Sequence, residues 1–276
     1  SNGCVLAKVA DGFAAIIALK CETDFVANGA DFIALTQSIL DAAVAAKAKD
    51  IEAVKELTLA DGQKILDAVT QRSGITGEKM ELDGYNVLEG ENIEAYDHMG
   101  KHTLATMVQT NKPVAEIGHK LAMQVAAMKP VALDASKVSQ AVLDEEYKTA
   151  VEKTKLEQVE KYVENMLKKA GINPAHVDSD EHIESNMKKG WITEEQAKEA
   201  REIKVKAAAE KAASLNENMI DNIAKGRVQK FLKENCLVDQ EFQFGDGDKA
   251  SVSQWLAKQD KDLKIVDFKR FTLSAE

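Results

Sequence analysis

The chain has 276 residues, 45% hydrophobic and 30% charged, which is enough for about two domains with buried cores. Its formal net charge of -10, with both signs interleaved, argues against a phosphate backbone as main partner, because nucleic-acid binding normally needs a concentrated basic face. No apolar run approaches the ~20 residues of a membrane-spanning helix, and no signal peptide is recognisable. Three widely spaced cysteines form neither a disulfide framework nor a zinc motif. We therefore expect a cytoplasmic protein without membrane or direct nucleic-acid contacts.

The N-terminal segment predicts a β-hairpin followed by a helix. Two apolar segments, 4–9 and 14–19, flank Asp11-Gly12, a pair typical of a tight hairpin turn. The second of these segments is apolar almost throughout, so we expect that strand to be covered on both faces. A polar connector, 21–27, leads into a helix that Asn28 is expected to cap.

The same order of elements starts again at Tyr85. A strand at 80–82 is expected to complete the first sheet, and further strands are predicted near 86–90 and 103–108 before a helix at 114–127. Aligning the two polar connectors superposes strand, connector and helix in the two parts of the chain. We interpret this as a diverged internal duplication. It predicts an α+β fold with two related subdomains of antiparallel sheet plus helices.

The second half of the chain is mostly helical. Residues 134–170 have a continuous helical pattern. Residues 170–213 are charged and Ala-rich, and Thr193 with Gln196 predicts a capping box there. This composition indicates a projecting helical hairpin rather than a compact core. A strand at 265–273 is expected to return to the second sheet.

These patterns predict three regions. Residues 1–84 form an N-terminal core subdomain, and residues 85–133 with 214–276 form a C-terminal core subdomain. Residues 134–213 form long helices and a projecting, coiled-coil-like insertion.

The sequence gives little support for a phosphate-binding loop or for a functional cluster of carboxylates. Gly74 and Gly77 lack the Lys and Ser/Thr that a phosphate-binding loop requires. The neighbouring carboxylates of Glu78, Glu81 and Asp83 are interpreted as a solvated loop, because such side chains are ordinarily exposed.

Two further chemical groupings are weak. His98 and His102 have the spacing of metal ligands on a helix, but Gly100 lies between them and a strand follows. A catalytic group of Cys21, His98 and Asp24 lacks any residue that would orient the base, and a cysteine at the end of an apolar strand is usually inert. We therefore expect neither an enzyme nor a metal or cofactor site.

The connector Thr23-Asp24-Phe25-Val26 has two interpretations. In the first, Phe25 packs beneath the following helix while Thr23 or Asp24 helps to cap it. In the second, Phe25 is an exposed aromatic anchor of the kind that dominates protein interfaces. The residues alone favour packing, because aromatic side chains lie more often in cores than at contacts.

An ordered set of motifs resembles the elongation factor Ts family. The segment 21–27, Cys-Glu-Thr-Asp-Phe-Val-Ala, is similar to the C-x-T-D-F-V-A run of that family. Residues 96–101 resemble its Tyr-x-His segment, residues 122–130 its A-M-x-V-A-A-x-x-P helix end, and residues 226–231 its G-R-x-x-K-[FY] motif. Together the matches extend over nearly the whole chain in the correct order.

The resemblance implies a guanine nucleotide exchange factor. Such a protein binds elongation factor Tu in its GDP-bound and nucleotide-free forms and promotes GDP release during translation, without a cofactor. The residues expected to disturb the magnesium and phosphate site of elongation factor Tu are Thr23, Asp24, Phe25 and Val26. His98, with Gly100, is expected to press on the nucleotide-binding side of that partner.

The sequence departs from the family pattern in two places. The N-terminal helical module with its T-G-[AV]-G motif is not found, so we expect the chain to match the core and C-terminal region of the family. The stretch 171–213 is longer than the compact pattern and resembles a projection that some members use for dimerisation, which leaves a homodimer open. The alternative function is a non-enzymatic helical adaptor that binds a partner through residues 170–213.

Overall fold

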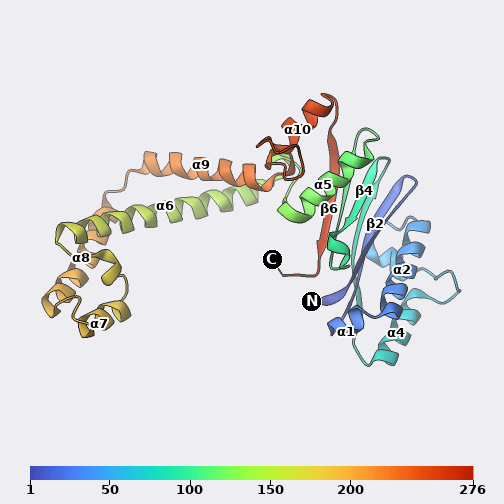
Figure 1. Ribbon diagram of the computed structural model, residues 1–276, viewed down its shortest axis with the longest axis horizontal. Coiled ribbons are helices and arrows are strands. Elements are labelled where there is room, and N and C mark those ends of the chain that lie inside the picture. Colours follow the sequence, from blue (N-terminus) through green and yellow to red (C-terminus); the bar gives the residue numbers. More distant parts are fainter. Residues whose placement is uncertain (276) are drawn as a thin grey trace. The chain divides into compact units, whose positions relative to one another are not determined.

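The computed structural model describes residues 1–275, and the chain divides into two compact units. The first unit comprises Ser1–Lys137 and Lys233–Glu276, and the second comprises Val138–Leu232. Within the described residues, ten α-helices accompany six strands arranged in two three-stranded sheets (Figure 1). The α+β class and the two sheet subdomains that the sequence predicted are confirmed.

The first sheet has the order β1-β2-β3 and is antiparallel. Its strands are β1 (Asn2–Ala10), β2 (Phe13–Cys21) and β3 (Glu81–Glu89). Gly12, with φ of 72°, closes the predicted hairpin, because glycine adopts this left-handed conformation without steric cost. One correction concerns β3: a single strand replaces the two short strands expected at 80–82 and 86–90.

The second sheet repeats this arrangement with the order β4-β5-β6. Its strands are β4 (Ile93–Asp97), β5 (Leu104–Thr110) and β6 (Ile265–Thr272), so the tail returns to the second sheet as predicted. In each sheet the central strand leads into a helix that packs on its own sheet: α2 (Ala30–Ala45) after β2, and α5 (Ala115–Met128) after β5. The matching topology supports the internal duplication.

The two sheets of the first unit pack face to face, and β2 shows this most clearly. Ile17 and Leu19 of β2 are buried on the side of α2, whereas Ile16 and Ala18 are buried in a cluster with Met107 of the second sheet. The prediction that both faces of this strand are covered is confirmed. Hydrophobic burial on both sides therefore stabilises the strand that leads directly into the connector at residue 23.

The remaining elements of the first unit are short. They are the helices α1 (Asp24–Ala27), α3 (Ile51–Lys55), α4 (Ile65–Thr76) and α10 (Val252–Gln259), with the 3-10 helices η1 (His98–Gly100), η2 (Ala135–Lys137) and η4 (Leu237–Asp239).

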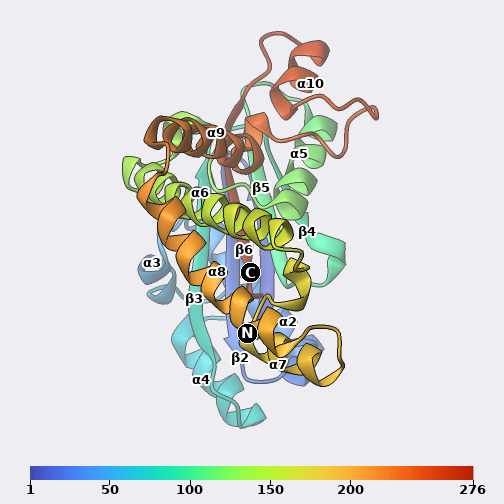
Figure 2. The same ribbon diagram turned by 90° about the vertical axis from the view of Figure 1, so that its left-hand side faces the viewer.

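The second unit is helical. It contains α6 (Gln140–Lys169), η3 (Pro174–His176), α7 (Asp180–Lys188), α8 (Glu194–Ala213) and most of α9 (Glu217–Asn235). Helix α8 packs along α6 (Figure 2), and the capping box of Thr193 and Gln196 is confirmed. The charged composition gave no indication of a compact core here, yet Val177, Ile183 and Ala200 are fully buried in a small apolar cluster.

No helix within residues 1–275 combines the length and the apolarity needed to cross a membrane.

Candidate functional site

The connector at residues 23–26 forms a one-turn helix, α1. Thr23 caps its N-terminus, with Oγ1 accepting a hydrogen bond from the Val26 N–H at 3.3 Å. Asp24 places a carboxylate in the first turn, where the helix dipole favours negative charge. The prediction for Asn28 is wrong: it closes the C-terminus of α1, and Gly29 precedes α2 without a side-chain cap.

Helix α1 exposes its aromatic residue. Phe25 is 86% exposed, whereas Val26 is half-buried and Ala27 is buried. The packing interpretation of Phe25 is therefore wrong, and Thr23 caps the one-turn helix α1 rather than the longer helix α2 that follows. An exposed phenylalanine on a helix whose other apolar side chains face the core is available as a contact residue.

Glu78 fixes the start of α1 although it lies in a solvent-exposed loop, as the sequence predicted. Its Oε1 accepts hydrogen bonds from the backbone N–H groups of Thr23 at 2.9 Å and Glu22 at 3.0 Å. Its Oε2 accepts the hydroxyl of Thr23 at 2.6 Å. These bonds, the Thr23 hydroxyl foremost, hold the pKa of the Glu78 carboxyl below its usual value.

The second predicted contact segment is η1. The ring of His98 meets Tyr96 edge to face at 5.7 Å between centroids, and its Nδ1 is buried without a hydrogen-bond partner in the described structure. Gly100 has φ of 65°, and Met99 adopts φ of 57° while being 66% exposed. A non-glycine residue in this region is uncommon and indicates a locally strained turn. The Nδ1 of His102 faces the Asp97 carboxylate, whereas the ring of His98 contacts Tyr96, so the two histidines do not face a common ligand position.

The structure brings both segments to the same end of the two-sheet core. Asn2 at the start of β1 pairs with Cys21, the last residue of β2 before α1. Three residues further along β1, the Val5 N–H donates to the carbonyl of His102 at 2.7 Å. Helix α1 and η1 therefore both lie near the first residues of β1 (Figure 1).

The environment of Cys21 does not fit a catalytic thiol. Partial burial, followed by the negative charge of Glu78, raises the pKa of Cys21. An activated cysteine needs a lowered pKa, because the thiolate is the nucleophile. The thiol of Cys21 therefore lacks the activation that a catalytic cysteine needs.

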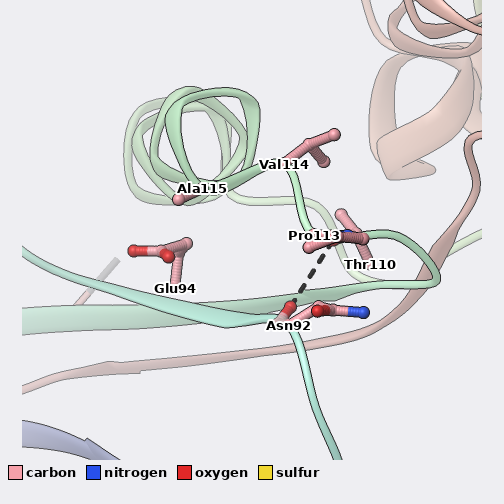
Figure 3. Close-up of a pocket in the computed structure, with 6 residues that line it drawn as sticks. All are labelled: Asn92, Glu94, Thr110, Pro113, Val114 and Ala115. Atoms are coloured by element: carbon pink, nitrogen blue, oxygen red, sulfur yellow. Dashed lines mark hydrogen bonds between the residues drawn. The ribbon is translucent and has the colours of Figure 1, made fainter.

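A small pocket of about 200 Å³ lies elsewhere on the second sheet, as Figure 3 shows. Its lining includes Asn92, Glu94 and the residues that begin α5, and the Thr110 N–H donates to the Asn92 carbonyl at 3.0 Å. Since β4 begins and β5 ends here, the pocket is at the opposite end of these strands from η1. It contains none of the predicted site residues.

Sequence reasoning missed two residues at the site end. Met99 has no local pattern that predicts exposure. Glu78 follows Gly77, whose φ of 74° ends α4, but its hydrogen-bond partner Thr23 is 55 positions away. No pattern within a short window reveals such a contact.

Comparison with known proteins assigns the family. The family model described as "Elongation factor TS" matches residues 22–171 and 168–275. The chain belongs to the elongation factor Ts family. Elongation factor Ts of Bacteroides fragilis is 60% identical over 277 residues, covering 100% of this chain and 83% of the relative. The Phocaeicola vulgatus protein of the same name is 59% identical over 276 residues, with the same coverage. The Porphyromonas gingivalis elongation factor Ts is 38% identical over 277 residues, covering 80% of its own length.

Proposed function

We propose that this elongation factor Ts family member is a guanine nucleotide exchange factor that binds elongation factor Tu·GDP and promotes GDP release during translation elongation. It does so by binding alone, without covalent chemistry. The observation that carries the proposal is the exposure of Phe25, at 86%, on a capped helix that follows a buried strand.

The mechanism is a coupling between two binding equilibria. A protein that binds the nucleotide-free form of its partner more tightly than the GDP-bound form weakens GDP binding by the same factor. It therefore has only to favour the state in which the magnesium and phosphate contacts are broken. Thr23, Asp24, Phe25 and Val26 would intrude beside the magnesium and phosphate site, with Phe25 as the wedge.

A second contact would come from η1. His98 and Gly100 lie at the same end of the core as α1, so one face of the protein can present both segments to a single partner. In this proposal His98 presses on the nucleotide-binding side of elongation factor Tu. Two separated contacts would restrict the orientation of the bound partner and keep the wedge aligned.

The direct test is stopped-flow release of a fluorescent GDP analogue from cognate elongation factor Tu, with and without this chain. We expect acceleration that increases with the concentration of the chain and then saturates. The same experiment with the wedge variant Phe25→Ala assigns the effect to α1. Release that stays at the spontaneous rate at every concentration of the folded chain would contradict the proposal.

The alternative, an adaptor that binds a partner through residues 170–213, has one observation in its favour. Trp191 is 59% exposed beside the small core of the second unit, with Lys189 Nζ 4.7 Å from its ring. The same surface is where a homodimer would form. Charge reversals within 170–213 separate the two functions: they should abolish adaptor binding or dimerisation and barely change GDP release. Sedimentation equilibrium measures whether the chain is a monomer or a dimer, and how the charge reversals change that equilibrium.

A further inference from the structure

The strongest unassigned feature is a pair of carboxylates that bridge two loops far apart in the sequence. Glu78 accepts both the Glu22 and Thr23 backbone N–H groups, and Glu22 Oε2 in return accepts the Lys79 backbone N–H at 2.8 Å. The two chain segments, 22–23 and 78–79, therefore hold each other through reciprocal hydrogen bonds. Bonds from N–H groups to ionised carboxylates are stronger than neutral ones.

The loop that carries Glu78 is itself held in place. The Ser73 hydroxyl donates to the Glu78 carbonyl at 2.6 Å, and the Glu78 N–H donates to Thr76 Oγ1 at 3.3 Å. Gly77 at the end of α4 adopts the left-handed conformation that such a turn requires. The backbone of Glu78 is thus held in place independently of the contacts that its side chain makes at the start of α1.

Helix α1 needs such support. It has only four residues, far fewer than an isolated helix requires for stability in water. Phe25, its largest side chain, is exposed and contributes almost no packing. Besides the burial of Ala27 and part of Val26, hydrogen bonds around its first turn hold α1: those to Glu78, and one from the Cys21 thiol to the Thr23 carbonyl.

We propose that Glu78 is a positioning residue for the exchange reaction: with Glu22, it pre-organises α1 so that Phe25 is presented in the geometry that binds elongation factor Tu. This proposal rests on the exchange function proposed above. Without Glu78, α1 samples orientations that do not bind, and apparent affinity falls in proportion to the lost population of the competent one.

The proposal predicts a specific kinetic pattern. In the GDP-release assay, Glu78→Ala should raise the concentration of the chain at half-maximal rate by about tenfold, the effect of reducing the competent population to about a tenth. The maximal rate should change less than twofold, because the bound partner restores the orientation of α1. The matched control is Glu81→Gln, which removes the charge of a nearby carboxylate whose ion pair within residues 1–275 is with the Lys79 side chain, at 3.1 Å. It should leave both parameters unchanged.

A double-mutant cycle distinguishes positioning from general damage. If Glu78 acts through the wedge, adding Glu78→Ala to Phe25→Ala should cause little further change in the half-maximal concentration. Full additivity of the two effects would overturn the proposal. If Glu78→Ala fails to fold, Glu78→Gln, which retains one carbonyl acceptor, provides the same cycle.

Amide hydrogen exchange of the free chain tests the positioning without the partner. Glu78→Ala should accelerate exchange at the Thr23 and Val26 amides at least tenfold, while the β1–β2 amides remain protected. Unchanged protection of the Thr23 and Val26 amides from exchange in Glu78→Ala would refute the proposal that Glu78 positions α1. A wild-type chain that does not accelerate GDP release would instead refute the exchange function, and the amide result would still decide whether Glu78 holds α1.

Discussion

Gly84 of β3 lies directly against the ring of Phe271 of β6, so the two sheets meet where a side chain is missing. A Cβ at Gly84 would come within 2.6 Å of the Phe271 Cζ and 2.7 Å of the Ala18 Cβ. The register between β2 and β3 also shifts next to Ala18. This close approach shows that packing between the two sheets requires glycine at position 84.

Gly84→Ala should therefore destabilise the fold by about 1–3 kcal/mol through overpacking. The matched control is Gly74→Ala within α4, where an added Cβ meets no atom within 4 Å. That change should stabilise the protein by roughly 0.5–1 kcal/mol through reduced backbone entropy of the unfolded chain. Urea denaturation measures both. Equal effects of the two substitutions would contradict the packing argument.

Phe25→Ala should leave stability almost unchanged, within about 0.5 kcal/mol, because the side chain is exposed. If Phe25 is an interface hot spot, its truncation should cost ~2 kcal/mol of coupling, or roughly a 30-fold loss of acceleration of GDP release. Phe32→Ala in α2 is the contrasting variant: this residue is 2% exposed, and its loss should destabilise by about 3–5 kcal/mol. Thermal unfolding measures the stability of both variants, and stopped-flow GDP release measures their exchange activity. Together they distinguish a residue that contacts the partner from a residue of the core.

The contribution of Glu78 to stability should depend on pH. Hydrogen bonds from the Thr23 hydroxyl, and then from backbone N–H groups, lower the pKa of Glu78 in the folded state from its ordinary value of 4.5. A group with a lowered folded pKa stabilises fully above its unfolded pKa and loses that effect as the pH falls through the folded pKa.

The difference in unfolding free energy between wild type and Glu78→Gln should therefore be constant above about pH 5.5 and shrink as the pH falls below 4.5. Urea denaturation between pH 3 and 7 measures this difference, and taking it between two variants cancels the other carboxylates. A difference that stays constant down to pH 3 would show that the carboxylate charge of Glu78 is not involved.

The cysteines should react slowly and in a defined order. Burial raises the pKa of Cys4 to about 11, so its thiol stays protonated, and Cys236 is also buried. Cys21 is only half-buried and should be alkylated first by iodoacetamide at pH 8, yet more slowly than free cysteine because its own pKa is raised. Peptide mass mapping over time measures the order. Preferential modification of Cys4 in the folded protein would contradict the burial.

Much of the fold was predictable because its signals are local. The Asp11-Gly12 turn, the double-sided apolar strand β2 and the capping box of Thr193 each depend on residues close together in sequence. The motif at 21–27 likewise indicated the family before any geometry was known. The repeated order of strand, connector and helix predicted the two related sheets.

Two features could not be predicted, because each depends on contacts between distant residues. Residues Glu81–Glu89 form one strand, because β2 pairs with it along nearly its whole length despite a register shift next to Ala18. The apolar cluster around Ile183 forms only when α7 and α8 fold together with the end of α6. A pattern of charged and Ala-rich residues does not specify that packing.

The sequence by itself determined the buried strand that precedes residue 25 and the chemistry of the Phe25 side chain, because hydrophobic patterning acts within a few residues. Only the tertiary structure decided that Phe25 faces solvent and that Glu78 holds its helix. Exposure of a side chain is decided by which distant segments cover it, and here Glu78 binds the backbone at residues 22 and 23 while leaving the ring of Phe25 uncovered.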